Sequence, residues 1–236
     1  MIEGVKYAEI NNLDSVKALL NEKTAAIIVE PVQGEGGVYV CSKEFLTGLR
    51  KLCDERDIAL ILDEVQCGMG RTGTIMTYFQ YDILPDILCL AKGIGAGFPM
   101  GAFVANKKFA AAMEPGDHGS TYGGNPMAGQ ACRTVFKILE DTKMIDHVQD
   151  ISEYLIEKLD DLQEEFPCIK ERRGLGLMIG LEFDKPVKDI VKTCLDLGLI
   201  VVTAGPHVVR MLPPFITNEK DVDQAIAILK EAIEKN

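Results

Sequence analysis

Short apolar runs and amphipathic stretches alternate along the first half of the chain. Residues 25–29 form an apolar run that stops at a proline, and residues 58–62 form a second run that stops at an acidic pair. Between them, residues 42–56 carry apolar side chains at helical spacing behind Ser42, a favoured N-cap residue. Strand, helix and strand in this order predict a βαβ unit and therefore a parallel sheet.

Two further strands are predicted at residues 87–91 and 101–105. The interval between them is too short for a crossover helix, so the second of the two should run antiparallel to the first. The pattern changes after residue 126, where helices and short strands alternate. We therefore expect an α/β fold with a mixed, mostly parallel sheet in residues 1–126 and a small α+β domain in residues 127–236. The elements expected in the second domain are helices at 128–140, 145–166, 187–197 and the C-terminal end, and strands at 177–183, 200–202 and 208–211.

Composition and charge narrow the range of functions. The 236 residues are 47% hydrophobic and 26% charged, which is typical of a globular protein. A formal charge of −11 argues against partners that bind through a basic face, namely nucleic acids and anionic membranes. The chain has no apolar run of membrane-spanning length, and its start lacks a signal-peptide layout, so we expect a cytoplasmic protein. Seven scattered cysteines and three distant histidines predict free thiols and no metal site.

Polar side chains follow the predicted strands at the edge where ligands bind in open parallel sheets. Asp63 and Glu64 end one strand, and Lys92 precedes a glycine-rich turn at the end of the next. An acid and a lysine at neighbouring strand ends indicate either a partly buried salt bridge or a ligand site. Residues 68–73 also match a dinucleotide-binding glycine pattern. However, two carboxylates precede this pattern and no convincing helix follows it, so it does not favour a nicotinamide site.

Five motifs in order along the chain resemble the signatures of the class III pyridoxal-phosphate aminotransferases, and most closely those of the acetylornithine aminotransferases. The resemblance covers nearly the whole chain. It implies a fold-type I transferase that binds pyridoxal 5'-phosphate. The motifs are Glu30-Pro-Val-Gln-Gly-Glu-Gly-Gly37, Asp63-Glu-Val-Gln-Cys-Gly-Met-Gly-Arg-Thr-Gly73, Ala91-Lys92-Gly93, Gly119-Ser-Thr-Tyr-Gly-Gly-Asn-Pro126 and Arg210-Met-Leu-Pro-Pro214.

By resemblance to the family, residues at two strand ends would contact the cofactor ring. Asp63 matches the carboxylate that keeps the pyridine nitrogen protonated, which lets the cofactor act as an electron sink. Lys92 matches the lysine that attaches to the cofactor aldehyde; it must lose its proton to do so, which apolar surroundings favour. Val65 would pack on the ring, and Gln66 would hydrogen-bond its phenolic oxygen. Glu64 is a weaker cofactor-binding candidate, because strand alternation should turn it away from Asp63.

The remaining implied roles concern substrate and the second subunit. Thr121 matches a threonine that reaches the phosphate of the partner subunit's cofactor, and Ser120 matches a residue near the substrate, so a homodimer with shared active sites is expected. Arg210 can hold a substrate α-carboxylate bidentately. Glu35 resembles a gate residue that pairs with this arginine or releases it. An ordinary loop at 119–121 and an ordinary turn glutamate at 35 are the alternatives.

The implied reaction moves the terminal amino group of N-acetylornithine, or a similar ω-amine, to 2-oxoglutarate, giving a semialdehyde and glutamate. Ornithine, succinylornithine and 4-aminobutyrate are alternative donors. Family members are longer, and the chain resembles only their later portion. No strand in the sequence leads through small residues into a helix that could hold the phosphate within the same subunit. A non-catalytic fragment that serves as a structural or dimerisation partner is therefore the second hypothesis.

Overall fold

The computed structural model describes residues 3–236, which divide into two compact units. The first unit contains residues up to Pro31, Cys41–Gln66 and Tyr78–Val135. The second contains Val32–Val40, Cys67–Thr77 and Phe136–Asn236. This division differs from the predicted boundary at residue 126 in two ways: residues 127–135 lie in the first unit, and two loops from the N-terminal half belong to the second unit.

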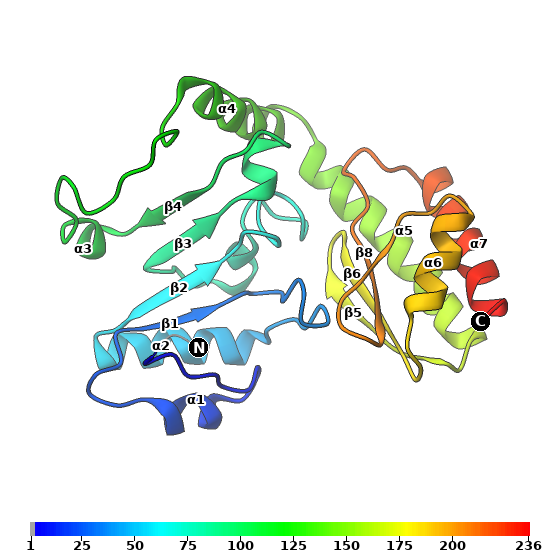
Figure 1. Ribbon diagram of the computed structural model, residues 1–236, viewed down its shortest axis with the longest axis horizontal. Helices are drawn as coiled ribbons and strands as arrows, with labels where there is room; N and C mark the ends of the chain where they lie inside the picture. The colour runs from blue at the N-terminus through cyan, green and yellow to red at the C-terminus, as the bar shows by residue number, and fades with distance from the viewer. Residues whose placement is uncertain (1–2) are drawn as a thin grey trace. The chain divides into compact units, whose positions relative to one another are not determined.

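The first unit contains a four-stranded sheet in the order β1-β2-β3-β4 (Figure 1). Strands β1, β2 and β3 are parallel, and β4 pairs antiparallel with β3, as the sequence predicted. The strands are β1 (Ala26–Val29), β2 (Ala59–Asp63), β3 (Ile87–Leu90) and β4 (Ala102–Ala105). The helices are α1 (Leu13–Leu19), α2 (Lys43–Arg56), η1 (Thr77–Tyr81), η2 (Lys92–Gly95), α3 (Lys107–Ala110) and α4 (Pro126–Asp141). Helix η1 begins in the second unit, and α4 ends there.

Helix α2 begins and ends where its sequence contains capping residues. The Ser42 side chain accepts a hydrogen bond from the Phe45 backbone N–H, which confirms the predicted N-cap. Asp57 ends the helix in the left-handed conformation (φ 55°). The inner face of α2 buries Phe45, Leu46 and Leu49. The burial of these apolar side chains stabilises the packing of α2 against strands β1 and β2.

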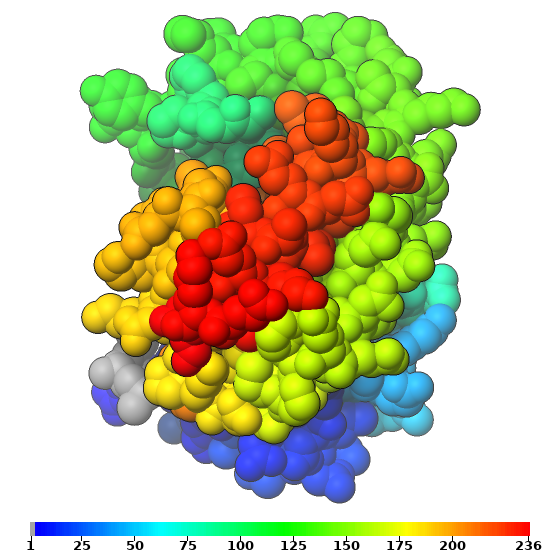
Figure 2. All heavy atoms as spheres, turned by 90° about the vertical axis from the view of Figure 1, so that its right-hand side faces the viewer, coloured from blue at the N-terminus to red at the C-terminus, as the bar shows by residue number. Residues whose placement is uncertain are grey.

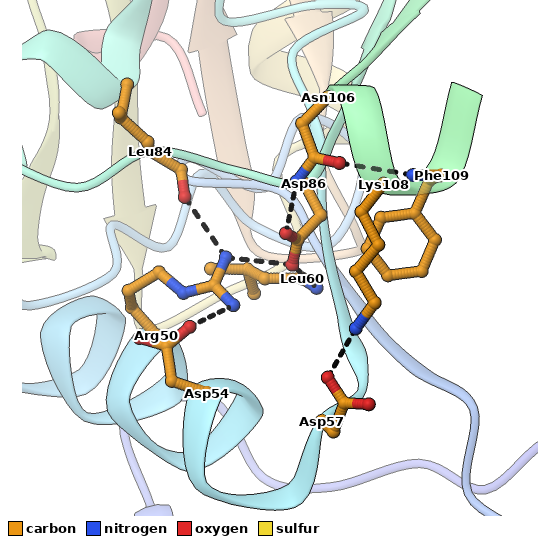
Figure 3. Close-up of polar contacts among 9 residues, drawn as sticks. All are labelled: Arg50, Asp54, Asp57, Leu60, Leu84, Asp86, Asn106, Lys108 and Phe109. Atoms are coloured by element: carbon orange, nitrogen blue, oxygen red, sulfur yellow. Dashed lines mark hydrogen bonds and ion pairs between the residues drawn. The ribbon is translucent and has the colours of Figure 1, made fainter. Parts of the chain in front are cut away.

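A charged cluster joins α2 to the strands of the first unit (Figure 3). The Asp86 carboxylate, just before β3, accepts hydrogen bonds from Arg50 Nη1 at 2.9 Å and from the Leu60 backbone N–H at 2.8 Å. It also accepts one from Asn106 Nδ2 at 2.6 Å, at the end of β4. Arg50 bonds Asp54 and the Leu84 carbonyl as well. One carboxylate therefore connects a helix and three strands.

The second unit contains a separate four-stranded sheet in the order β5-β6-β8-β7, with all pairs antiparallel. One face of this sheet packs against helices, and the space-filling view shows α7 between α5 and α6 on that side (Figure 2). Its elements are α5 (Met144–Glu165), β5 (Ile169–Leu175), β6 (Met178–Phe183), α6 (Lys188–Asp196), β7 (Val202–Thr203), β8 (Val208–Met211) and α7 (Glu219–Glu234).

The two loops from the N-terminal half cover the other face of this second sheet. Val32, Val38 and Cys67 form a buried cluster there with Met178 and Val208. Alternation along β6 explains the two faces: Ile179 and its alternate neighbours point to the helices, whereas Met178 and its alternate neighbours point to the loops. The sheet is thus buried on both sides within its own unit.

The sequence missed strand β5 and the short helices α1, η1, η2 and α3. Residues 170–173 of β5 read Lys-Glu-Arg-Arg, which lacks the apolar alternation expected of a strand. The structure shows why these charges are tolerated. Arg172 pairs with Asp160 of α5 on the helix side, and Arg173 pairs with Glu171 and Glu182 on the loop side.

Candidate functional site

The carboxyl ends of β2 and β3 bring the predicted acid and lysine to the same edge of the first sheet. Asp63 is the last residue of β2 and pairs in register with Cys89 of β3. Lys92 follows three positions later, at the start of η2. Asp63 Oδ1 accepts a hydrogen bond from the Val65 backbone N–H at 3.0 Å, which holds this carboxylate at the strand end. Burial, and then the negative charge of Asp63, raise the pKa of the Cys89 thiol.

The backbone at Lys92 adopts a conformation that lysine rarely takes. Its φ is +48°, in the left-handed region. This conformation is strained for lysine because, unlike glycine, lysine carries a Cβ. Such outliers occur often at functional sites, where the surrounding structure imposes them. The Lys92 residue is exposed. The described residues therefore do not provide the apolar surroundings that the sequence argument assumed for this amine.

The three residues after Asp63 have different surroundings. Glu64 is fully buried, and its Oε1 accepts a hydrogen bond from the Tyr78 backbone N–H at 2.7 Å. Burial, and then the charge of Glu64, raise the pKa of the Tyr78 hydroxyl. These contacts indicate a structural role for Glu64 and give no support to its predicted role in cofactor binding. Val65 and Gln66 are half-buried at the strand end, where their predicted roles stay predictions.

The loop that carries Ser120 and Thr121 is exposed throughout residues 111–124. Ser120 Oγ accepts a hydrogen bond from the Gly123 backbone N–H at 3.1 Å, which shapes the turn. Asn125 then caps α4, because its Oδ1 accepts from the Ala128 N–H at 3.0 Å and Pro126 occupies the first helical position. Ser120 and Thr121 are both exposed, and their predicted roles stay predictions.

Within the second unit, the structure joins the two predicted substrate residues in an ion pair. Arg210 Nη1 lies 2.8 Å from Glu35 Oε1 and also donates to the Gly34 carbonyl at 2.5 Å. The arginine side chain is only 9% exposed, whereas that of Glu35 is 74% exposed. A buried guanidinium whose partner is an exposed acid can exchange that acid for a substrate carboxylate.

The glycine-rich loop at residues 68–73 is a structural element and not a dinucleotide site. Arg71 Nη1 donates to the Leu177 and Pro213 carbonyls at 3.2 and 2.5 Å, and its guanidinium lies over the Phe215 ring. Burial lowers the pKa of Arg71 to about 10. The only helix that follows closely is the five-residue 3-10 helix η1. The loop therefore offers no regular helix N-terminus to a pyrophosphate.

Sequence reasoning missed Arg173 as a residue connected to the gate. Its Nε donates to the Gly37 carbonyl at 2.6 Å, two residues beyond Glu35, and its guanidinium lies 4.0 Å from the Tyr39 ring centroid. Arg173 could have been placed on the same sheet face as Arg210 only if residues 169–175 had been predicted as a strand. Their charged sequence does not show the apolar alternation that predicts one.

Across residues 3–236, no group of three or more His, Cys, Asp or Glu side chains is arranged to hold a metal ion. In the same range, none of the helices has the length and apolarity needed to cross a membrane.

Comparison with known proteins identifies the family. The sequence profile of the family described as Aminotransferase class-III matches residues 3–233. The chain belongs to the class-III aminotransferases. These enzymes depend on pyridoxal phosphate as a family, and the fold described above matches their solved structures.

Individual class-III aminotransferases match nearly all of this chain. The acetylornithine aminotransferase of Clostridium acetobutylicum is 46% identical over 234 residues, which are 99% of this chain and 60% of that protein. The crystal structure of N-acetylornithine aminotransferase from Stenotrophomonas maltophilia has 35% identity and a TM-score of 0.86, covering 98% of this chain and 62% of that one. A structure of Plasmodium falciparum ornithine delta-aminotransferase has 32% identity and a TM-score of 0.90, covering 95% and 60%. The chain therefore spans about 60% of the length of these relatives.

Proposed function

We propose that this class-III aminotransferase chain serves the transfer of a terminal amino group from N-acetylornithine, or a similar ω-amine, to 2-oxoglutarate. The observation that carries the proposal is the placement of Asp63 and Lys92 at the carboxyl ends of two adjacent strands. The names of the Clostridium and Stenotrophomonas relatives support the acetylated donor. The name of the Plasmodium protein favours ornithine as the second candidate donor. The cytoplasmic location expected from the sequence stays a prediction.

The residues at this edge fit the chemistry of pyridoxal phosphate. When bound, this cofactor accepts the electron pair that remains on the substrate Cα after its proton leaves. Asp63 would hold a proton on the ring nitrogen, and Lys92 Nζ would carry the proton to and from the substrate Cα. Val65 and Gln66, which follow Asp63 directly, would contact the ring face and its phenolic oxygen.

The Glu35–Arg210 pair suits a pocket that accepts two unlike substrates in turn. With the pair closed, the positive charge of Arg210 is neutralised, and the site accepts the ω-amine end of the donor. With Glu35 turned away, Arg210 can bind the α-carboxylate of 2-oxoglutarate or glutamate through two parallel hydrogen bonds. Ser120 would lie near the substrate, and Thr121 would reach the cofactor phosphate of a second copy in a homodimer; both roles rest on the family resemblance of their motif.

Reductive labelling tests the proposal directly. The chain is incubated with pyridoxal phosphate, reduced with borohydride and mapped by mass spectrometry. We expect the label on Lys92, and we expect the Asp63→Ala variant to retain the cofactor more weakly and to lose transamination. The exposed Lys107 on α3 supplies the matched control, because Lys107→Ala should leave labelling unchanged.

Two results would contradict the proposal. A Lys92 that stays unlabelled would favour a non-catalytic structural or dimerisation partner, the second hypothesis for this chain. Unchanged transamination in Asp63→Ala would show that the ring-nitrogen role belongs to another residue. Rates with acetylornithine, ornithine, succinylornithine and 4-aminobutyrate then rank the donors.

A further inference from the structure

Arg173 and Arg210 occupy one row of the second sheet. Arg173 of β5 pairs in register with Gly180 of β6, and Gly180 pairs with Arg210 of β8. Side chains that pair across strands point to the same face, so both guanidiniums stand on the loop side with a glycine between them. Adjacent strands lie about 4.8 Å apart, which separates the two arginine backbones by about 10 Å.

Gly180 leaves room for the loop that carries Glu35. A Cβ built on Gly180 would lie 2.9 Å from the Cβ of Val38 and 3.1 Å from Val208 Cγ1. Val38 is completely buried, although its φ of +58° is a rare conformation for a β-branched residue. The loop therefore inserts Val38 into the gap between the two arginines, and its packing there compensates a strained backbone.

Arg173 holds the same loop from one side. Its Nε donates to the Gly37 carbonyl at 2.6 Å and its guanidinium stacks on Tyr39. Glu171 and Glu182 bind its Nη1 and fix its orientation. The loop is also closed on itself, since the Gln33 N–H donates to the Tyr39 carbonyl at 2.9 Å and Val32 bridges to Val40. Arg210 contacts the same loop at Gly34 and Glu35 from the other side.

We propose that Arg173 is a positioning residue for the Glu35 gate: with Val38 seated on Gly180, it holds residues 32–40 in the conformation in which Glu35 pairs with Arg210. Arg173 acts on Arg210 only through this loop, and the inference rests on the proposed function of the Glu35–Arg210 pair. Loosening the loop would shift the gate toward its open state. The amino donor, which needs the closed pair, would then bind more weakly than 2-oxoglutarate, which needs the open one.

Two measurements on the 236-residue chain test this without any turnover. Hydrogen exchange reports the opening of residues 32–40, and phenylglyoxal modification mapped by mass spectrometry reports the accessibility of Arg210. In Arg173→Gln we expect both rates to rise roughly three- to tenfold, because a hydrogen bond and a stacking contact are lost. Arg71 lies on a different loop and is held by the Leu177 and Pro213 carbonyls, so its modification should keep the parental rate. Arg173→Lys retains a charge but lacks the planar stack, so its exchange should also exceed that of the parent.

The neighbouring arginine provides a matched control. Arg172 lies on the helix side of β5 and pairs with Asp160, so Arg172→Gln should leave both rates at residues 32–40 and Arg210 unchanged. If Arg173→Gln does not fold, Tyr39→Leu removes the stacking partner at a residue that is 39% exposed and should accelerate exchange in the same segment.

Glu35→Gln separates a failure of this inference from a failure of the proposed function. It should raise the phenylglyoxal reactivity of Arg210 while exchange at residues 32–40 stays at the parental rate. Unchanged Arg210 reactivity in Glu35→Gln would reject the gate itself. Parental exchange in Arg173→Gln would reject the positioning role of Arg173, whatever the gate does. In the cofactor-loaded enzyme, Arg173→Gln should raise KM for the amino donor more than KM for 2-oxoglutarate, and the reverse order would overturn the inference.

Discussion

Asp86 shows how one residue connects several elements of the first unit. Its carboxylate binds the guanidinium of Arg50, a backbone N–H of β2 and the side chain of Asn106 (Figure 3). Both members of the Asp86–Arg50 pair are largely buried, so neither charge could return to water if the other were removed. The sequence offers no sign of this role, since an aspartate after a proline reads as part of a turn.

We expect Asp86→Ala to lower the free energy of unfolding by about 2–4 kcal/mol, because it leaves Arg50 and the Leu60 N–H without their acceptor. Urea denaturation followed by circular dichroism measures the change. Asp82, four positions earlier, forms an exposed pair with Lys43 and is the control. Asp82→Asn removes the charge and keeps a side chain that tolerates the left-handed backbone at this position (φ +54°), so the midpoint should stay close to that of the parent. Equal losses in Asp86→Ala and Asp82→Asn would contradict the assigned role of Asp86.

At the scale of elements, the β5–β6 hairpin depends on a glycine that local turn rules alone would not single out. Gly176 has a φ of +55°, and a Cβ added there would lie 2.6 Å from the Thr72 carbonyl carbon and 2.7 Å from the Arg71 carbonyl oxygen. The Leu177 N–H donates to that same oxygen at 3.0 Å. The hairpin tip therefore packs backbone to backbone against the loop that follows the Asp63 strand, within the second unit.

Gly176→Ala should destabilise the protein by more than the backbone preference for glycine alone, which is about 1 kcal/mol. Gly198 is the matched control, because its φ is +94° and a Cβ there would meet nothing within 4 Å. Thermal unfolding of the two variants measures the difference. Equal shifts in Tm would show that the close approach at Gly176 contributes nothing to stability.

For the molecule as a whole, one face of the first sheet has little cover. Ile28 is 64% exposed and Phe103 is 46% exposed, and register places both on the face opposite the buried Leu60 and Leu88. Parallel sheets in α/β proteins are normally covered on both faces. This chain spans about 60% of the length of its relatives, so the portion of those proteins that it does not match is the natural candidate for covering this face.

We expect the unmatched portion of the Clostridium relative, supplied as a second polypeptide, to raise the Tm of the 236-residue chain in a concentration-dependent way. It should also increase Lys92 labelling by pyridoxal phosphate and borohydride. A chain with Ile28→Lys should respond less, because the added charge opposes burial of that face. A Tm that is independent of the added polypeptide would contradict this expectation.

Features that depend on neighbours along the chain could be read from the sequence. The apolar runs, the Ser42 cap and the short interval before β4 predicted the mixed sheet, and five ordered motifs identified the family and its candidate residues. These signals are local because strand alternation, helix capping and motif chemistry act over a few residues.

Contacts between residues far apart in sequence follow from the tertiary structure. The structure places the loops at 32–40 and 67–77 in the second unit and shows that the charged segment 169–175 is strand β5. It also shows that Glu64 is buried and accepts a hydrogen bond from the Tyr78 backbone N–H. It also set Arg173 and Arg210 in one row on either side of Gly180. Register between strands and the compensation of buried charges depend on contacts between residues far apart in sequence, which no local pattern encodes.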